Sequence, residues 1–543
     1  MIKQFPSDLK REFYRYDGKK LSQDLLAGLT VTAVALPLAL AFGVSSGADA
    51  AAGLITAIIA GILIGGLGGA SYQISGPTGA MTAILLTLSA KQGIEGVFIA
   101  GMISGVILVI AALLKAGKLV SIIPSAVITG FTSGIAIIIA LGQIDNLFGT
   151  VSHGHNIIQR FASYGELGFS IHWTPLIIGI SVVLLMMVWP KRWNAKFPSS
   201  LASIIVALVI NLIFKLDVAV VGSIPRTLLP ASRLTFSDLS WSVVGNSFVP
   251  AFSIAALGMI ESLLCGASAG KMKNERLQAD RELLAQGIGN IVIPFFGGVP
   301  ATAAIARTSV AIKSGGQTRL TSIIHSIGLI ASMFLLGPAM SNIPLSALGG
   351  VLVMTAWRMN EWHSIRNIFT LRYKSSIAQF FITMAATVVF DLTIAIVIGV
   401  FFSMLLFVIR STYLTITVEQ VDKNHKKGKN LTDENTNIKL VYVSGQLFFG
   451  SQQQMMQRLR SLEDAQTIIL SIRGVPSIDQ SAMGELEQLW KEMKAKKITL
   501  LFCGLQPPVE IMFKRSRFTE LIGMNSIFDN AVEAIDFLSY NES

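Results

Sequence analysis

Two short stretches inside the apolar part of the chain combine helix-breaking residues with small and hydroxyl residues. They are Gln73–Ala80 (QISGPTGA) and Phe296–Ala304 (FGGVPATAA). Backbone that cannot be ordinary helix is tolerated at membrane depth only where protein encloses it or where it lines a wet cavity. Pro77 and Pro300 lie in corresponding places of the two halves of the apolar region. Paired interruptions of this kind indicate the binding site of a transporter.

Each stretch predicts a short helix that begins in the membrane interior. Pro77 fixes φ and lacks an N–H, which suits the first position of a helix. We therefore expect half-helices over 77–90 and 301–313. A helix N-terminus carries about half a positive elementary charge and several unpaired N–H donors, which suit an anion. Together the two stretches predict an anion site.

Glu261 and Arg307 are charged residues within otherwise neutral apolar segments. Intramembrane carboxylates are costly and usually face a cavity, an ion or a proton path. Glu261 is therefore interpreted as a residue for ion or proton coupling, with a structural hydrogen bond between two helices as the alternative. Arg307 either supplies positive charge to an anion cavity or extends along its short helix to the cytoplasmic surface. Phe42, about one turn beyond Pro37, is a candidate wall of that cavity.

Other motifs carry weaker signals. His153 and His155 in a polar loop are weak evidence for a metal, and the Gly-x-x-x-Gly spacing of Gly61 and Gly65 is typical of close helix packing. The sequence contains no phosphate-binding loop of nucleotidases and no nucleophile elbow. We therefore expect neither ATP-driven transport nor hydrolysis, and no metal or other cofactor.

The composition is that of a membrane protein. Hydrophobic residues make up 52% of the chain and charged residues 14%, whereas soluble domains carry about a quarter charged residues. The pI near 9.5 does not indicate nucleic-acid binding, because the cations fall in short clusters between apolar segments. Two cysteines, Cys265 and Cys503, do not suggest a disulfide framework, and no cleavable signal peptide is expected.

Charge asymmetry orients the apolar segments. We count fourteen segments, of which the two half-helices are too short to cross the membrane. With the N-terminus inside, the cations concentrate in the cytoplasmic loops, at 10–20, 115–118, 191–196, 271–281, 313–319 and 358–374. The positive-inside rule thus predicts a multi-pass protein of the cell (inner) membrane with both termini in the cytoplasm. Glu361 and Asp391 are expected at the membrane interface.

The composition changes after Arg410. We expect an N-terminal segment at 1–20, a membrane domain at 21–411, a polar linker at 412–437 and a small α/β domain at 438–543. In the last of these, strands at 438–444, 467–472 and 498–502 alternate with helices at 451–462, 480–495, 507–515 and 529–538. Such alternation predicts a sheet covered by helices.

Several motifs resemble those of the SulP anion permeases, the bacterial relatives of sulfate-permease solute carriers and prestin. They are Asp24–Val31, Ala35–Gly43, Ile74–Ala80 and Phe296–Thr308, and the C-terminal part resembles a STAS domain. The resemblance implies a UraA-like 7+7 inverted repeat with a core and a gate domain. It also implies elevator-like movement of the core against the gate and a homodimer.

The resemblance also implies roles for individual residues. Phe42 would close the anion site, Arg307 would contribute charge, and the site would be lined by Thr78, Gly79, Ala80, Ala303 and Ala304. Glu261 matches an acidic position that, in sodium-coupled bicarbonate members, is an aspartate followed one turn later by a hydroxyl residue. Here Cys265 takes the place of that hydroxyl residue, which favours a proton on Glu261 over a sodium ion.

The C-terminal domain contains Asp479-Gln480-Ser481, which resembles the Asp-Ser-Ser loop phosphorylated in anti-sigma-factor antagonists. Gln480 replaces a serine there, so docking to a cytosolic partner or regulation is expected instead of a phosphoswitch.

The leading hypothesis is a secondary transporter for sulfate, bicarbonate or a dicarboxylate. The coupled ion would be H+ or Na+, and the protein would be surrounded by membrane lipid. A passive anion channel is one alternative. A membrane sensor that signals through the STAS domain is another. The residues do not distinguish among the candidate anions, because helix dipoles recognise charge and size.

Overall fold

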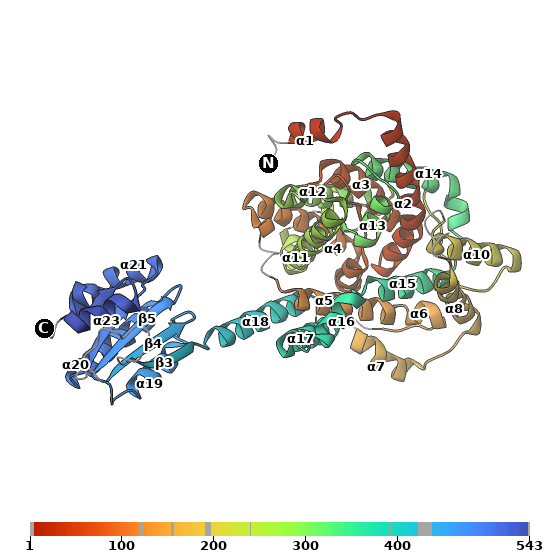
Figure 1. Ribbon diagram of the computed structural model, residues 1–543. Helices are drawn as coiled ribbons and strands as arrows, with labels where there is room; N and C mark the ends of the chain where they lie inside the picture. Colours follow the sequence, from red (N-terminus) through yellow and green to blue (C-terminus); the bar gives the residue numbers. More distant parts are fainter. Residues whose placement is uncertain are drawn as a thin grey trace. The chain divides into compact units, whose positions relative to one another are not determined.

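The computed structural model describes residues 5–118, 123–153, 157–190, 197–238, 241–390, 392–421 and 437–540. It divides into two compact units, Met1–Val400 and Phe401–Ser543, each of which is described by itself. The first unit is helical, and the second contains a five-stranded sheet (Figure 1). His155, Asp391 and the cations at 191–196 lie outside the described residues.

The apolar helices form two successive sets of seven segments in the described part of the chain. Gly93, with φ at 72°, breaks α4 into a half-helix and a longer segment, and each counts as one. The first set is α2 (Gly18–Ser45), α3 (Ala50–Leu67), α4 (Gly79–Leu113), α5 (Ser125–Gly142), α8 (Trp173–Val188) and α10 (Ser199–Phe214). The second set is α11 (Trp241–Lys273), α12 (Ala279–Val292), α13 (Ile305–Lys313), α14 (Leu320–Met340), α15 (Leu345–Met359), α17 (Lys374–Val389) and α18 (Leu392–Ser411). The predicted 7+7 arrangement of fourteen segments is confirmed. The short helices are α1 (Phe5–Glu12), α6 (Ile144–Phe148), α7 (Ile157–Leu167) and α16 (Trp362–Thr370).

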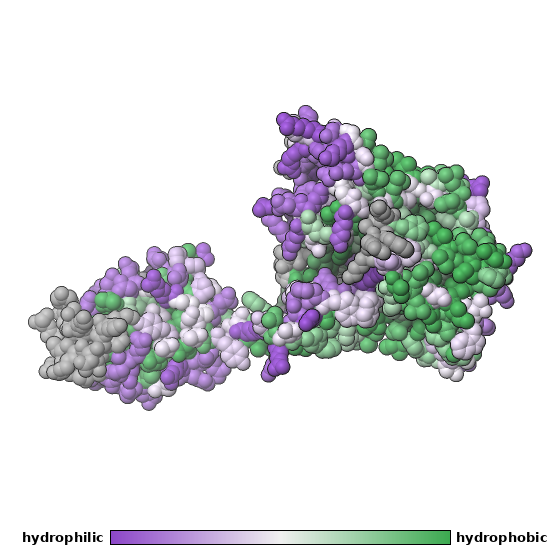
Figure 2. Space-filling model, turned by 45° about the vertical axis from the view of Figure 1, so that its right-hand side comes forward, coloured by the Kyte–Doolittle hydropathy of each residue, from purple (hydrophilic) through white to green (hydrophobic). Residues whose placement is uncertain are grey.

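The surface of the helical unit is that of a membrane protein. Six stretches among the described residues, in α2, α3, α4, α5–α6, α11 and α14, are long and apolar enough to span a membrane. Large apolar side chains such as Leu113, Phe214 and Leu335 are exposed on it. Figure 2 shows hydrophobic residues gathered over much of its visible face. Soluble monomers rarely expose apolar surface of this extent.

The helices of this unit pack in two groups. In the first group, α4 packs against α11 and α12, and α2 packs against α3, α13 and α14. In the second group, α5 packs against α17, and α8 packs against α10 and α15. We call these groups the core and the gate. They meet where α4 contacts α5 and where α2 contacts α15.

Glycines allow the core helices to approach closely. A Cβ at Gly61 would lie 2.1 Å from Ser326 Oγ, and one at Gly65 would lie 2.2 Å from Ser322 Oγ. The close packing predicted for this Gly-x-x-x-Gly spacing is confirmed, and α14 is the helix that uses it. Gly53 is tighter still, because its Cβ would lie 2.0 Å from the carbonyl oxygen of Ala39 in α2.

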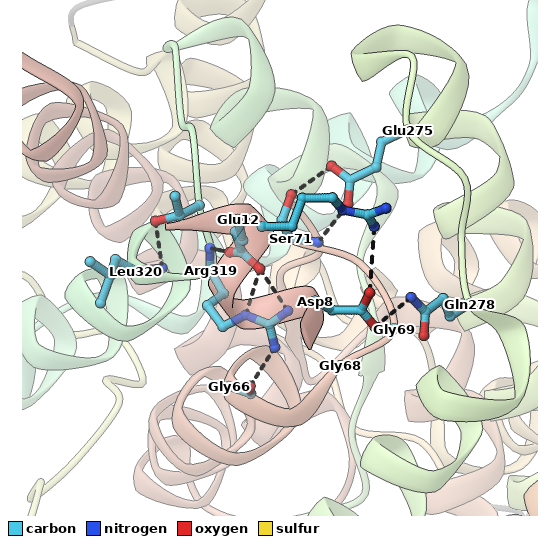
Figure 3. Close-up of polar contacts among 12 residues, drawn as sticks. Asp8, Glu12, Gly66, Gly68, Gly69, Ser71, Glu275, Gln278, Arg319 and Leu320 are labelled. Atoms are coloured by element: carbon cyan, nitrogen blue, oxygen red, sulfur yellow. Dashed lines mark hydrogen bonds and ion pairs between the residues drawn. The ribbon is translucent and has the colours of Figure 1, made fainter. Parts of the chain in front are cut away.

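Helix α1 is held against the core by two carboxylates, in a cluster that we call the N-terminal clamp (Figure 3). Asp8 pairs with Arg281 of α12 at 2.7 Å, and Glu12 pairs with Arg319, which precedes α14, at 2.8 Å. The two arginine side chains are 5% and 6% exposed. They also donate to main-chain carbonyls at the end of α3. The ring of Phe5 lies against both guanidinium groups, with centroid distances of 4.7 and 5.3 Å. The clamp therefore joins elements of both repeats.

The second unit is an α/β domain. Its sheet has the order β3 (Thr415–Val421), β4 (Ile438–Ser444), β5 (Thr467–Gly474), β6 (Thr499–Cys503), β7 (Ile527–Phe528), antiparallel between β3 and β4 and parallel thereafter. The helices are α19 (Gln452–Arg460), α20 (Gln480–Ala495), α21 (Pro507–Arg515), α22 (Phe518–Ile522) and α23 (Ala531–Tyr540). The sheet has a hydrophobic cluster on each face. Val441 belongs to the cluster formed with α19, α20 and α21, and Leu440 belongs to the cluster formed with α23. Strand β3 lies within the 412–437 stretch assigned to a linker, so part of that stretch is sheet.

Candidate functional site

The two interrupted stretches meet in a short antiparallel pairing. Strand β1 (Ser75–Gly76) pairs with β2 (Thr302–Ala303). Helix α4 begins shortly after β1, at Gly79, and α13 begins shortly after β2, at Ile305. The pairing therefore places the starts of both half-helices next to each other.

The first half-helix begins at Gly79, and the predicted start at Pro77 is wrong by two residues. Thr78 is the N-cap and has extended backbone, with φ at −127° and ψ at 156°. The N–H of Thr82 makes the first bond within the helix, to the carbonyl of Thr78. The N–H groups that precede it, including those of Gly79 and Ala80, have no partner within the helix. They are the donors expected for an anion.

The second half-helix is shorter than the predicted 301–313. Residues 301–304 are not helical, because this part of the chain pairs with β1 and a paired strand requires extended backbone. Ala303 lies in β2 and Ala304 is the N-cap. The helix begins at Ile305, which is 50% exposed, so this start is accessible. The role of Ala303 and Ala304 as lining residues stays a prediction.

Phe42 and Ile139 cover the start of α4. A Cβ at Gly79 would lie 2.3 Å from Ile139 Cδ1 and 3.2 Å from Phe42 Cε1, so a glycine is required for this approach. Phe42 is buried and belongs to the core. Phe42 therefore lies beside the start of the first half-helix, and its role in closing the site stays a prediction. Ile139, which the sequence analysis did not single out, belongs to the gate helix α5.

Arg307 does not extend to the cytoplasmic surface, which was one of its two predicted positions. Its side chain is 1% exposed, and Nη2 donates to the carbonyl of Pro77. It thus ties the second half-helix to the bend that precedes the first. Nη1 lies next to Gly76 and makes no hydrogen bond among the described residues. A contribution of this charge to anion binding stays a prediction.

Glu261 of α11 reaches the N-cap of the first half-helix. Thr78 Oγ1 donates to Glu261 Oε2 at 2.9 Å, and the charge of Arg307 is near enough to act on this carboxyl group. Cys265, one turn later, is buried and its thiol donates to Thr308 Oγ1 of α13 at 3.4 Å. Glu261 therefore contacts the first half-helix and Cys265 the second.

Two buried amide side chains of α12 hold the residues around the β1–β2 pairing in place. The sequence analysis did not identify them. Gln286 donates to Ser75 Oγ at 2.9 Å. Asn290 accepts from the N–H of Ala301 at 2.7 Å and donates to its carbonyl at 2.9 Å. Residues four apart lie on one face of a helix. Two amides at this spacing in an apolar segment were the signal that could have indicated these residues.

Comparison with known proteins finds related families for both parts of the chain. A family model described as the sulfate permease family matches residues 21–386, and one described as the STAS domain matches residues 431–534. The "Putative sulfate transporter YvdB" of Bacillus subtilis (strain 168) is 33% identical over 531 residues, which cover 95% of this chain and 98% of that protein. The bicarbonate transporter BicA of Picosynechococcus sp. (strain ATCC 27264 / PCC 7002 / PR-6) is 27% identical over 507 residues, 90% of this chain and 89% of that protein. The solved structure of SLC26A9 has a TM-score of 0.83 over 97% of this chain and 91% of that one. Its identity of 16% means that this likeness concerns the fold.

Proposed function

Because the chain belongs to the sulfate permease family, we propose that it is a secondary transporter that couples the movement of a small anion to that of a proton. The observation that carries this proposal is the meeting of two half-helix starts beside Glu261 and the buried Arg307. Sulfate, bicarbonate and small dicarboxylates are the candidate substrates, and the names of the relatives favour the first two.

The anion is held by main-chain donors and one guanidinium group. The free N–H groups at the starts of α4 and α13 form two positive helix ends. Arg307 adds a full charge, and its Nη1 is a buried donor without a protein partner among the described residues. Burial of such a donor without a partner costs about 1–3 kcal/mol, so an anion that accepts from it gains affinity.

The proton is carried by Glu261. A carboxylate next to a bound anion repels it, and protonation removes this repulsion. Anion binding and proton binding therefore favour each other, and this coupling is reciprocal. The anion and the proton therefore cross the membrane together, which is symport.

The core moves relative to the gate in an elevator-like manner. The β1–β2 pairing and the bond from Arg307 to Pro77 make the two half-helices one body. At the site, the gate residue Ile139 packs against Gly79, and such an apolar contact can slide.

The protein forms a homodimer in the cell membrane, with both termini in the cytoplasm. The STAS domain docks a cytosolic partner.

Transport by purified protein in liposomes tests the proposal. Uptake of labelled sulfate, bicarbonate and dicarboxylates is measured with imposed pH gradients and imposed sodium gradients, and protein-free liposomes are the control. We expect accumulation of one of these anions when the outside is acidic. Accumulation driven by sodium alone would contradict proton coupling, and electrical currents far above carrier rates would indicate a channel.

A further inference from the structure

A cavity of about 200 Å³ lies between the core helices α2 and α4 and the gate helix α5. It is lined by residues from the end of α2, the half-helix of α4, the end of α5 and the short helices α6 and α7. Ile139, the residue that covers Gly79, forms part of its wall. Ile139 therefore borders both the cavity and the start of α4.

Arg160 brings a positive charge to this cavity. Its Nη2 donates to Asp145 at 2.7 Å and its Nε donates to Ser152 at 2.9 Å. Its Nη1 is turned toward Gly142, where a Cβ would lie 4.0 Å from it. Gly142 also lines the cavity. The guanidinium group is thus held from one side and presents its third nitrogen to the cavity.

The partner carboxylate, Asp145, also lines the cavity, and both of its oxygens already accept hydrogen bonds. Asp145 Oδ2 accepts from Arg160 and Ser152, and Oδ1 accepts from the Tyr164 hydroxyl at 2.6 Å. Burial and the hydrogen bond to Asp145 raise the pKa of Tyr164 to about 12, so this hydroxyl remains a donor at neutral pH. Three donors therefore compensate the negative charge of Asp145, which weakens its repulsion of an anion.

Amide groups complete the polar side of the cavity. Gln143 is 4% exposed, and its Oε1 accepts from Asn146 at 3.0 Å. Its Nε2 makes a contact of 3.4 Å with Ser45 Oγ, which is long for a hydrogen bond. Since Ser45 belongs to the core and Gln143 to the gate, this weak bond spans the two groups. A buried amide with a poor partner is a donor that a ligand can recruit.

We propose that this cavity is an outer anion site, in which a small oxyanion binds Arg160 Nη1 and the Gln143 amide before it passes Ile139. The inference rests on the proposed function, because it adds a second site to the same pathway. In the orientation expected from the cation pattern, α7 lies on the side opposite to the cytoplasm. The outer site would therefore act on anions that arrive from outside.

Substitutions at Arg160 and Asp145 should have opposite effects on the apparent affinity for external anion. Arg160→Gln removes the cation and should raise the KM for uptake into intact cells about tenfold, the equivalent of roughly 1.4 kcal/mol. Asp145→Asn removes the competing carboxylate and should lower this KM several-fold. The double variant Asp145→Asn/Arg160→Gln avoids an unpaired carboxylate and should behave like Arg160→Gln.

Measurement from the other face provides the control. Inside-out vesicles from the same cells present the cytoplasmic face, and their KM should be unchanged in all three variants. Arg233→Gln changes a cation in the loop between α10 and α11, one that donates to the carbonyl of Pro230 and is not among the residues that line the cavity. Its KM should match that of the unmodified protein on both faces.

The two proposals can fail separately. If the unmodified protein moves no anion, the proposed function is wrong and the outer site falls with it. If the unmodified protein transports but the Arg160 and Asp145 variants keep its external KM, the outer site alone is wrong. A rise in KM of equal size on both faces would also contradict an outer site.

Discussion

The Thr78 hydroxyl donates a 2.9 Å hydrogen bond to the carboxyl group of Glu261. Thr78 caps the first half-helix, and Glu261 belongs to α11, which is the first helix of the second repeat. A residue that can bind a proton thus contacts the place where the half-helix presents its free N–H groups. This relationship supports the proposed proton coupling, because a change of charge on Glu261 acts directly on the start of α4.

Replacing Glu261 with Gln should separate anion binding from coupling. Glutamine keeps an acceptor for Thr78 and carries no proton to exchange. We expect anion counterflow to persist in Glu261→Gln proteoliposomes, while an imposed pH gradient no longer drives accumulation. Glu95→Gln, at an exposed position, is the matched control and should respond to the gradient. Gradient-driven accumulation by Glu261→Gln at the rate of the unmodified protein would contradict the assignment of Glu261 as the coupling residue.

Replacing Gly79 with Ala should hinder the anion site sterically. The new Cβ would lie 2.3 Å from Ile139 Cδ1, and overpacking of this kind costs about 1–3 kcal/mol. We expect a transport rate at least several-fold lower in Gly79→Ala. Ile139→Val removes the clashing Cδ1, so Gly79→Ala/Ile139→Val should recover most of the rate. A double variant as slow as Gly79→Ala would mean that the contact with Ile139 is not the cause.

Local features of the sequence predicted the elements well. The strand at 438–444 and the helix at 507–515 have the predicted bounds, because period-two alternation and a proline at a helix start are local signals. The two interruptions near Pro77 and Pro300 were found for the same reason. Their helix starts were misplaced, because the β1–β2 pairing that extends residues 301–304 joins distant parts of the chain.

Long-range polar contacts could not be predicted from the sequence. Arg307 was expected either in the anion cavity or at the surface, and its bond to the Pro77 carbonyl depends on how the two half-helices cross. Asp8 and Glu12 lie in a short polar helix whose sequence shows acidic residues and no partner. The sequence analysis counted their partners, Arg281 and Arg319, as cytoplasmic loop cations. The ion pairs depend on the packing of α1 against α12 and α14, which the sequence does not reveal.

Replacing Arg307 with Met should weaken both stability and anion binding. A hydrogen bond to a charged group contributes about 1.5–3 kcal/mol, so loss of the bond to Pro77 should lower the Tm. A ligand that binds only the folded state raises the Tm of a protein, by an amount that grows with the ligand concentration relative to its Kd. We expect the Tm increase that the transported anion gives the unmodified protein to be absent in Arg307→Met. Arg366→Met, on an exposed face of α16, should retain it. An unchanged Tm increase in Arg307→Met would rule out a role for this charge in binding.

Two glycines of α3 should respond to alanine in opposite ways. A Cβ at Gly53 would lie 2.0 Å from a main-chain oxygen of α2, which cannot move without displacing the helix. A Cβ at Gly66 would meet no atom within 4 Å. Since alanine is favoured over glycine in a helix by about 0.5–1 kcal/mol, Gly66→Ala should keep or raise the Tm. Gly53→Ala should lower the Tm sharply or abolish the monodisperse peak in size-exclusion chromatography. Equal behaviour of the two variants would contradict the close packing of α2 on α3.

The N-terminal clamp should weaken in acid. The hydrogen bond from Gln278, together with the charge of Arg281, lowers the pKa of Asp8 below its ordinary value. A carboxyl group whose pKa falls on folding stabilises the folded state above its unfolded pKa, and this contribution is lost as the pH drops through the folded pKa. Asp8→Asn should therefore lower the Tm by a constant amount from about pH 5 to 8, and the difference from the unmodified protein should shrink below about pH 4. Thermal unfolding of both proteins across this range measures the effect, with Glu95→Gln as the control that shows no difference. A Tm difference that grows below pH 4, or none at pH 7, would show that Asp8 does not hold α1 as a charged group.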